Sequence, residues 1–311
     1  MDKACKINFV IPLFNEGIVF NQLIKRLVSV IDASPDSIKV ILVDDGSSDN
    51  TPELMKHLAQ SDDRFTAVLL SRNFGHQIAL TAGLAQVTAS EAVMVLDGDL
   101  QDPPELIHPF YAKLKEGYDV VYAIRQTRKE VWWKQWAYAG FYRLQSKLTN
   151  IAIPIDSGDF CIMSRRVVDH LNSMPEESRY IRGMRSWIGF NQTGIAYHRD
   201  ARADGDTKYP ISKLFKLAFN GVFNFSEAPI QFITLIGMLT IFISGGYLAW
   251  ILFEKIVYDT APRGFTAIIL LITLFGGAQM MAIGLLGEYV LRIFFQTKGR
   301  PLYVIKEIVS K

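Results

Sequence analysis

The segment EAVMVLDGDLQDPPE, residues 91–105, decides how the fold is read. Its first half is a short apolar run that predicts a buried strand over residues 92–96. Its second half places two carboxylates, Asp97 and Asp99, directly after that strand. A D-x-D pair alone is usually a turn. At the end of a central strand it indicates a site, because two neighbouring carboxylates repel one another unless a cation lies between them.

The chain around this segment alternates between strand and helix patterns. Four further apolar runs, at residues 7–11, 38–43, 65–70 and 119–123, predict strands, and the helix-period segments between strands are 18–31, 52–59, 77–87 and 105–115. Such alternation predicts an α/β fold with a mainly parallel sheet that is covered on both faces. Sites in such sheets lie at the carboxyl ends of the strands.

Polar residues follow four of the predicted strands at those ends. They are Pro12, Asn15 and Glu16 after the first strand, Asp44, Asp45 and Ser47 after the second, Asn73 after the third, and Asp97, Asp99 and Gln101 after the fourth. One such end could be only a helix cap, as Ser48 or Asp49 could be for the helix at 52–59. Four polar ends together indicate a ligand site.

The oxygen-rich D-x-D end favours a hard cation, Mg²⁺ or Mn²⁺, with phosphate oxygens of a substrate completing its coordination. The sequence has neither a P-loop nor a G-x-G-x-x-G motif, which argues against P-loop and dinucleotide-binding proteins. A net charge of +2 gives no overall basic field for nucleic acid. Cys5 and Cys161 are expected to be free thiols, without a zinc site.

The composition changes near residue 229. Residues 230–253 and 265–287 carry no charge, and each run is long enough to span a membrane. A pair of buried core helices is the alternative. We therefore expect a catalytic domain at 1–209, an interfacial amphipathic helix at 210–228, a two-helix hairpin at 229–296 (about 230–253 and 265–290) and a tail at 297–311.

Basic residues orient this hairpin. They cluster on its outer flanks, at Lys208, Lys213 and Lys216 and at Arg292, Lys298, Arg300 and Lys306. Because positive flanks face the cytoplasm, and because the N-terminus has no signal-peptide pattern, we expect a multi-pass protein of the cytoplasmic (inner) membrane with both termini in the cytoplasm. The tail could add a strand to its own sheet or to a neighbouring subunit, which leaves a homo-oligomer open.

Several motifs together carry a family resemblance. VIPLFNE, VDDGSSDNT, SRNFGH and DGDLQDPPE resemble the nucleotide-sugar-binding half of family 2 glycosyltransferases with the GT-A fold. IDSGDFCIMSRR, YIRGMRSWIGF and RADGDTKYP, followed by two spans, are similar to the polyprenyl-phosphate glycosyltransferases, which include dolichol-phosphate mannose synthase relatives and bacterial undecaprenyl-phosphate sugar transferases.

The resemblance implies a role for each matching residue. Pro12, Asn15, Glu16, Asp44, Asp45, Ser47 and Asn73 would hold the nucleotide of a UDP- or GDP-sugar. Asp97 would lie between ribose and diphosphate, and Asp99, Gln101 and Asp97 would hold the metal. Asp156 and Asp159 belong to the motif where the family keeps its acceptor-side carboxylate; for Asp159 a capping role before 164–174 is the alternative. Arg125, Arg202 and Lys208 match basic positions that meet phosphates.

The resemblance implies transfer of one sugar from a nucleotide diphosphate sugar to undecaprenyl or dolichyl phosphate at a lipid bilayer, with inversion. Processive members carry Q-x-x-R-W, but this chain has Arg182 at the glutamine position and no Arg-Trp pair, which argues against a polymer synthase. The rival hypothesis is a non-catalytic, membrane-bound nucleotide-sugar-binding subunit. His76 follows a strand-end loop and is assigned no role.

Overall fold

The structure is a computed structural model, and it describes residues 5–125, 157–177, 179–197, 228–258 and 264–311. The chain divides into two compact units. The first comprises residues 1–146, 151–215 and 300–311, and the second comprises residues 147–150 and 216–299. Each unit is described by itself.

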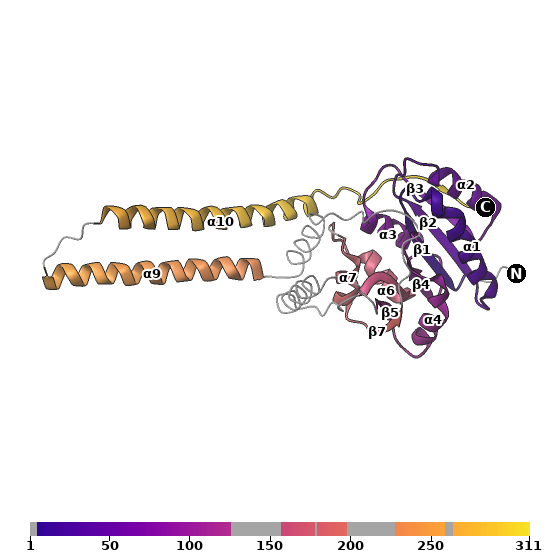
Figure 1. Cartoon of the computed structure of the whole chain (residues 1–311), viewed down its shortest axis with the longest axis horizontal. Helices are drawn as coiled ribbons and strands as arrows, with labels where there is room; N and C mark the ends of the chain where they lie inside the picture. Colours follow the sequence, from indigo (N-terminus) through magenta and orange to yellow (C-terminus); the bar gives the residue numbers. More distant parts are fainter. Residues whose placement is uncertain (1–4, 126–156, 178, 198–227, 259–263) are drawn as a thin grey trace. The chain divides into compact units, whose positions relative to one another are not determined.

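An eight-stranded sheet forms the centre of the first unit, with the strand order β7-β5-β6-β4-β1-β2-β3-β8 (Figure 1). Its strands are β1 (Ile7–Leu13), β2 (Ile38–Asp44), β3 (Phe65–Leu70), β4 (Ala92–Val95), β5 (Val120–Arg125), β6 (Ser157–Ser164), β7 (Gln192–Tyr197) and β8 (Ile305–Val309). All five predicted strands are therefore present, within a few residues of their predicted bounds.

The sheet is mainly parallel, as the alternation predicts. β1 pairs in parallel with β2 and β4, β2 with β3, and β5 with β7. β6 runs antiparallel to both β4 and β5, so β5 points the same way as β4. The carboxyl ends of β1 to β5 consequently share one edge of the sheet, and this edge carries the predicted site residues.

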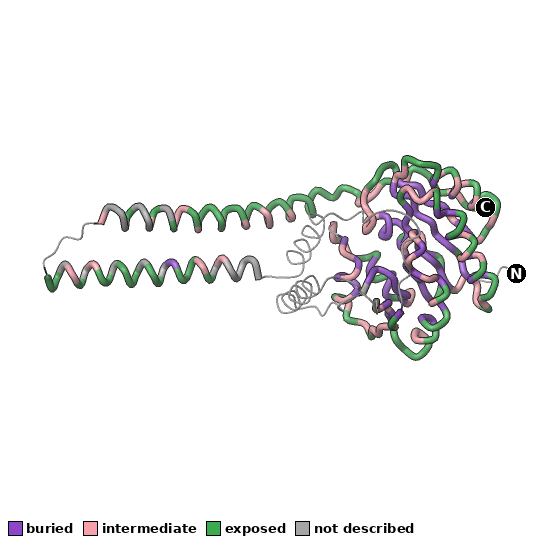
Figure 2. Tube along the Cα trace, viewed as in Figure 1, coloured by how far each residue is buried: buried purple, intermediate pink, exposed green. Residues whose placement is uncertain are grey.

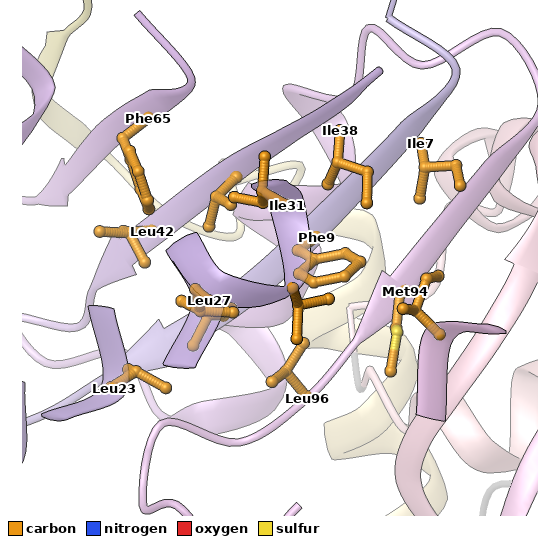
Figure 3. Packing of buried hydrophobic residues seen from close by; sticks show 14 of the residues in the cluster. Ile7, Phe9, Leu23, Leu27, Ile31, Ile38, Leu42, Phe65, Met94 and Leu96 are labelled. Atoms are coloured by element: carbon orange, nitrogen blue, oxygen red, sulfur yellow. The ribbon is translucent and has the colours of Figure 1, made fainter. Parts of the chain in front are cut away.

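Helices cover both faces of this sheet. On one face lie α1 (Gly17–Ala33), α2 (Thr51–Ser61), the short 3₁₀ turn η1 (Pro104–Leu106) and α4 (Ile107–Lys115), and on the other lie α3 (His76–Ala85), α6 (Arg165–Ser173) and α7 (Ile181–Ile188). Figure 3 shows Leu23, Leu27 and Ile31 of α1 packed over Phe9 and Leu42 of the strands. Burial is accordingly concentrated in the sheet (Figure 2).

The position of α3 depends on a glycine. A Cβ atom on Gly83 would lie 2.4 Å from Val10 Cγ1 and 2.9 Å from Val43 Cγ2, so a larger residue would push the helix away from β1 and β2. This close packing holds α3 against β1 and β2, and His76 and Gln77 are the first residues of that helix.

The second unit contains two long apolar helices that pack against each other, α9 (Ala228–Tyr258) and α10 (Phe265–Thr297). Both contain a stretch long and apolar enough to span a membrane, Leu235–Tyr258 and Leu274–Thr297. The alternative of buried core helices is wrong for the large apolar side chains described in them: Phe242 is 77% exposed and Ile272 is 67% exposed. Such surfaces suit a lipid environment.

Both long helices extend beyond their predicted ends, α9 to Tyr258 and α10 to Thr297. In α10 an ion pair of 2.8 Å joins Glu288 to Arg292, one turn later, where the extension begins. The predicted interfacial helix at 210–228 lies outside the described residues except for Ala228, where α9 begins.

The C-terminal tail forms β8 on its own sheet. β8 pairs antiparallel with β3, in the register Ala67 with Val309 and Val68 with Ile308. One of the two alternatives for the tail is thereby confirmed, and residues 300–311 belong to the first unit rather than to the hairpin that precedes them.

Candidate active site

The loops after β1 and β2 are joined by hydrogen bonds between predicted site residues. The Asn15 backbone, which has a left-handed φ of 54°, donates its N–H to Ser47 Oγ at 2.9 Å. Its side-chain Oδ1 accepts from the Ser48 N–H at 2.8 Å. The Glu16 N–H donates to Thr51 Oγ1 at 3.1 Å. Pro12 is buried within β1 beside Val43 of β2, so the predicted residues after β1 and β2 lie close together at this end of the sheet.

Asp44 and Asp45 are both buried at this edge of the sheet, and their carboxylates accept hydrogen bonds from backbone N–H groups of the neighbouring loops. Asp44 Oδ2 accepts from Gly46 at 3.1 Å and from Ser47 at 3.2 Å. Asp45 Oδ1 accepts from Phe74 at 2.8 Å, and its Oδ2 accepts from Gly75 at 3.0 Å. Burial raises the pKa of both carboxyls, although these hydrogen bonds lower it.

The loops after β2 and β3 touch at Gly46. This glycine has a left-handed φ of 70°, and a Cβ on it would lie 2.4 Å from the Arg72 carbonyl carbon and 2.5 Å from Asn73 N. Only a residue without a side chain permits this approach. Asn73, predicted to contact the nucleotide, is exposed on the resulting surface.

The D-x-D motif after β4 contains carboxylate oxygens that accept few hydrogen bonds from the described residues. Asp97 Oδ1 is buried, and no hydrogen bond to it comes from the part of the chain that the structure describes. Asp99 Oδ1 accepts from the Gln101 N–H at 3.2 Å across Leu100, whose φ of 64° marks a tight turn. Carboxylate and amide oxygens fit Mg²⁺ or Mn²⁺.

Within the described ranges no three His, Cys, Asp or Glu side chains lie close enough to hold a metal on their own. A cation at Asp97, Asp99 and Gln101 would therefore complete its coordination with oxygen atoms of water or of a substrate.

Asp159 lies in β6, with its side chain 5% exposed, and it accepts several hydrogen bonds. Gln77 Nε2 donates to Oδ2 at 2.8 Å, and Arg182 donates through Nε to Oδ1 at 2.9 Å and through Nη2 to Oδ2 at 3.3 Å. The capping alternative is wrong, because Ser164 occupies the position before α6 and Asp159 is in the strand.

His76 connects the two halves of the site. Its Nε2 lies 3.6 Å from Asp97 Oδ1 and 3.4 Å from Asp159 Oδ2. Burial disfavours its protonation, but the hydrogen bond to Asp159 and the charges of Asp97 and Asp159 outweigh burial and raise the pKa of His76 to about 9. Its position between two carboxylates therefore favours the protonated form of His76 at neutral pH.

Opposing influences also act on Asp159. Burial raises the pKa of its carboxyl, but the charge of Arg182 and hydrogen bonds from His76 and Arg182 hold the pKa well below its usual range. Asp159 is consequently an ionised anchor for the groups around it.

Three members of this cluster, His76, Gln77 and Arg182, were not predicted from the sequence. His76 ends the quoted SRNFGH motif and begins a helix, which was a usable signal. Arg182 was noticed only because it departs from the processive motif. Nothing in the local sequence of Gln77 indicates that it links Asp159 to the Ile181 N–H, to which its Oε1 is bonded at 2.9 Å.

The remaining predicted residues lie at the margin of the described structure. Arg125 ends β5, at the same sheet edge as the other residues. Asp156, Arg202 and Lys208 lie outside the described residues, and their assignments stay predictions.

Comparison with known proteins agrees with this arrangement. The model of glycosyl transferase family 2 matches residues 8–171. The uncharacterized glycosyltransferase YkcC of Bacillus subtilis (strain 168) is 40% identical over 308 residues, which cover 99% of this chain and 95% of that protein. A prophage bactoprenol glucosyl transferase homolog of Escherichia coli (strain K12) is 36% identical over 304 residues, 97% of this chain and 99% of that protein.

The crystal structure of S. aureus TarS 1-349 in complex with UDP-GlcNAc is 13% identical and has a TM-score of 0.49, covering 89% of this chain and 81% of that chain. The family match spans more than half of the sequence, and the two relatives match nearly all of it. The protein therefore belongs to glycosyl transferase family 2 and is a glycosyltransferase with a GT-A-like α/β fold.

Proposed function

We propose that the protein transfers a single sugar from a UDP- or GDP-sugar to a polyprenyl phosphate, such as undecaprenyl or dolichyl phosphate, with inversion of the anomeric centre. The acceptor class is supported by whole-length relatives named bactoprenol glucosyl transferase, which are 36% and 35% identical to this chain. A lipid acceptor also suits a chain that carries two helices apolar enough to span a membrane.

One observation carries the proposal. His76 lies within 3.6 Å of Asp97, at the predicted donor end of β4, and within 3.4 Å of Asp159, in the predicted acceptor motif. Two carboxylates from separate motifs therefore share one cation. A donor lying along the strand ends and an acceptor approaching Asp159 would meet at this point, as group transfer requires.

Asp97, Asp99 and Gln101 would hold a divalent cation, Mg²⁺ or Mn²⁺, which when bound stabilises the charge of the departing diphosphate. The loops that contain Asn15, Ser47 and Asn73 would hold the nucleotide. The buried Asp97 Oδ1 accepts no hydrogen bond from the described residues and has the longer ion-pair contact with His76, at 3.6 Å, so this oxygen has capacity left for a divalent cation at this end of the sheet.

The acceptor phosphate is already anionic at neutral pH, so its attack needs little help from a base. Its approach to another anion is the difficulty, and cationic side chains address it. Arg182 and His76 supply two positive charges beside Asp159. We assign Asp159 an orienting role, because hydrogen bonds to both of its oxygens and its lowered pKa make it a weak proton acceptor.

The reaction would take place at the cytoplasmic face of the inner membrane. α9 and α10 would cross the bilayer as a hairpin, and the basic residues Arg292, Lys298 and Arg300 after α10 favour a cytoplasmic C-terminal flank.

The test is a donor screen with the full-length protein purified in detergent. Several UDP- and GDP-sugars would be incubated with undecaprenyl phosphate and Mg²⁺ or Mn²⁺, and the lipid product would be identified by mass spectrometry. One sugar added to the lipid phosphate is the expected product, and its anomeric configuration, determined by NMR, should be opposite to that of the donor.

Asp99→Asn is the matched inactive control in this screen. A lipid bearing a chain of sugars would contradict single transfer. Sugar transfer only to a non-lipid acceptor would contradict the polyprenyl phosphate assignment.

A further inference from the structure

The C-terminal tail packs on the catalytic unit along an edge strand that leads directly into the site. Besides the pairing of β8 with β3, the Lys56 ammonium of α2 lies 2.6 Å from Glu307 Oε2, and Lys311 Nζ donates to the Ser61 carbonyl at 3.4 Å. The C-terminus accordingly lies beside α2 and β3 in Figure 1. These contacts fix the tail along β3 from Ala67 to Leu70.

The end of the tail nearest the site contacts the loop that follows β3. The Ser71 N–H donates to the Val304 carbonyl at 2.9 Å, and the pairing shifts register between Leu69 and Leu70. Ser71 is the first residue of the 71–75 loop, which carries Asn73. The tail therefore fixes the point at which this loop leaves the sheet.

The same loop is held on its other side by the loop after β2. Gly46 lies against the backbone of Arg72 and Asn73, and Asp45 accepts the N–H groups of Phe74 and Gly75. Residues 71–75 thus lie between two supports. One support is the predicted donor loop itself, and the other is the C-terminal tail.

Tyr303 adds a link toward α3. It is half-buried, and the charge of Arg179 acts on it: burial raises the pKa of Tyr303 and the Arg179 charge opposes that rise. Arg179 is buried, and its Nη1 and Nη2 donate to the carbonyls of Met174 and Leu171 at 2.8 Å each. Its Nε donates to Thr81 Oγ1 of α3 at 3.4 Å.

We propose that residues 303–309 are a positioning element for donor binding, which hold the 71–75 loop in the geometry that the nucleotide needs. This inference rests on the proposed function, since it takes the strand-end loops as the nucleotide site. Only residues 298–304 separate the end of α10 from β8. Donor affinity would therefore depend on a segment that the chain supplies after its membrane hairpin.

The test compares nucleotide binding by the full-length protein with binding by a chain that ends at Arg300. Calorimetry with UDP and with GDP, in Mn²⁺, would first establish which nucleotide the full-length chain binds. If the loop keeps its binding geometry only a tenth of the time without the tail, the dissociation constant should rise about tenfold. A synthetic peptide of residues 300–311 at millimolar concentration should restore most of that affinity.

A peptide with proline at positions 307 and 309 is the matched control, because these residues pair with Leu69 and Ala67 with their N–H groups toward β3, and proline cannot donate to the strand ladder. If the shortened chain does not fold, the full-length Val309→Pro variant decides, with Ser310→Pro, just beyond β8, as its control. Val309→Pro should weaken nucleotide binding and Ser310→Pro should not.

Unchanged nucleotide affinity in a folded chain without the tail would overturn this inference and leave the proposed function intact. A full-length chain that binds neither UDP nor GDP would overturn both. Restoration by the proline-containing peptide as well as by the native peptide would also overturn the inference, since strand pairing would then not be the cause.

Discussion

Asp159 and Arg182 form a two-point ion pair, with Arg182 Nε 2.9 Å from Oδ1 and Nη2 3.3 Å from Oδ2 of the carboxylate. The pair fixes the guanidinium plane relative to β6, and Gln77 bonds the same carboxylate from α3. A carboxylate used in this way orients a cation, whereas a general base must have an oxygen available for the incoming proton.

Asp159→Asn should therefore lower kcat by about 100-fold through misplacement of its partners, with donor affinity nearly unchanged. The double variant Asp159→Asn with Arg182→Gln should lose little more than the worse single variant, because the two residues act as a unit. Steady-state kinetics and donor calorimetry measure both quantities. Fully additive losses in the double variant would contradict an orienting role, and a donor affinity that falls in parallel with kcat would contradict placement on the acceptor side.

His76→Gln should reduce kcat by roughly 10- to 100-fold, since it removes a charged hydrogen-bonding partner between two carboxylates. Glutamine keeps the size and polarity of the side chain but cannot carry the charge. His108→Gln is the matched control, because His108 is an exposed residue of α4. Equal rates for His76→Gln and His108→Gln would show that the imidazolium does not contribute to transfer.

Arg182→Met should lower the free energy of unfolding at neutral pH, because it leaves the Asp159 carboxylate without its guanidinium partner. The Arg182 side chain is 26% exposed and that of Asp159 is 5% exposed, so the loss should be at most about 3 kcal/mol. The folded-state pKa of Asp159 is lowered, so its stabilisation is present above the unfolded-state value of about 4 and is lost as the pH falls through the folded-state value. The difference in melting temperature between wild type and Arg182→Met should thus shrink below about pH 4.

Thermal unfolding at several pH values in one detergent measures that difference. Lys113→Met, which removes the exposed ion pair between Lys113 of α4 and Glu116 just after it, should leave the melting temperature nearly unchanged at every pH. A difference for Arg182→Met that grows on acidification would contradict a lowered folded-state pKa for Asp159.

Much of the fold follows from the sequence because the strands β1 to β5 are short apolar runs in regular alternation with helices. The strands β6 and β7 were not predicted. The β6 sequence, SGDFCIMS, begins with a serine, a glycine and an aspartate, and the β7 sequence, QTGIAY, is only partly buried. Neither sequence has the apolar pattern of a central strand. Both are stabilised by their neighbours in the sheet rather than by local preference.

The grouping of the strand-end residues also follows from the sequence. Parallel topology brings strand ends together, as with Asn15 and Ser47. The partners of Asp159 could not be predicted in this way, because they come from the two helices α3 and α7. The approach of a helix such as α3 to the sheet depends on tertiary packing, including the contact of Gly83 with Val10. A lone histidine such as His76 has no spacing that indicates its neighbours.

Asp99→Asn should nearly abolish turnover while leaving the melting temperature close to that of wild type, because the variant removes one ligand charge at a partly exposed turn. Excess EDTA should have the same effect on the wild type, and added Mg²⁺ or Mn²⁺ should restore the rate. Turnover in EDTA that stays within about threefold of the untreated rate would contradict metal dependence.

The pairing of β8 with β3 also constrains the membrane topology. Because the tail and the catalytic unit of the same chain share one sheet, both must lie on the same side of the bilayer. An even number of crossings is then required, so α9 and α10 should either both span or both fail to span. Their apolar stretches favour two crossings, so the segment between the two helices, residues 259–264, should lie on the opposite side.

Trypsin added to sealed inside-out vesicles should therefore cleave the catalytic unit and remove the tail at Lys298 or Arg300, whereas sealed right-side-out vesicles should protect both. A single cysteine introduced at Asp259, in a chain with Cys5 and Cys161 replaced by serine, should react with a membrane-impermeant maleimide only in right-side-out vesicles. Labelling of that cysteine in inside-out vesicles, or protection of the tail while the catalytic unit is cleaved, would contradict the hairpin, because either result requires an odd number of crossings or none.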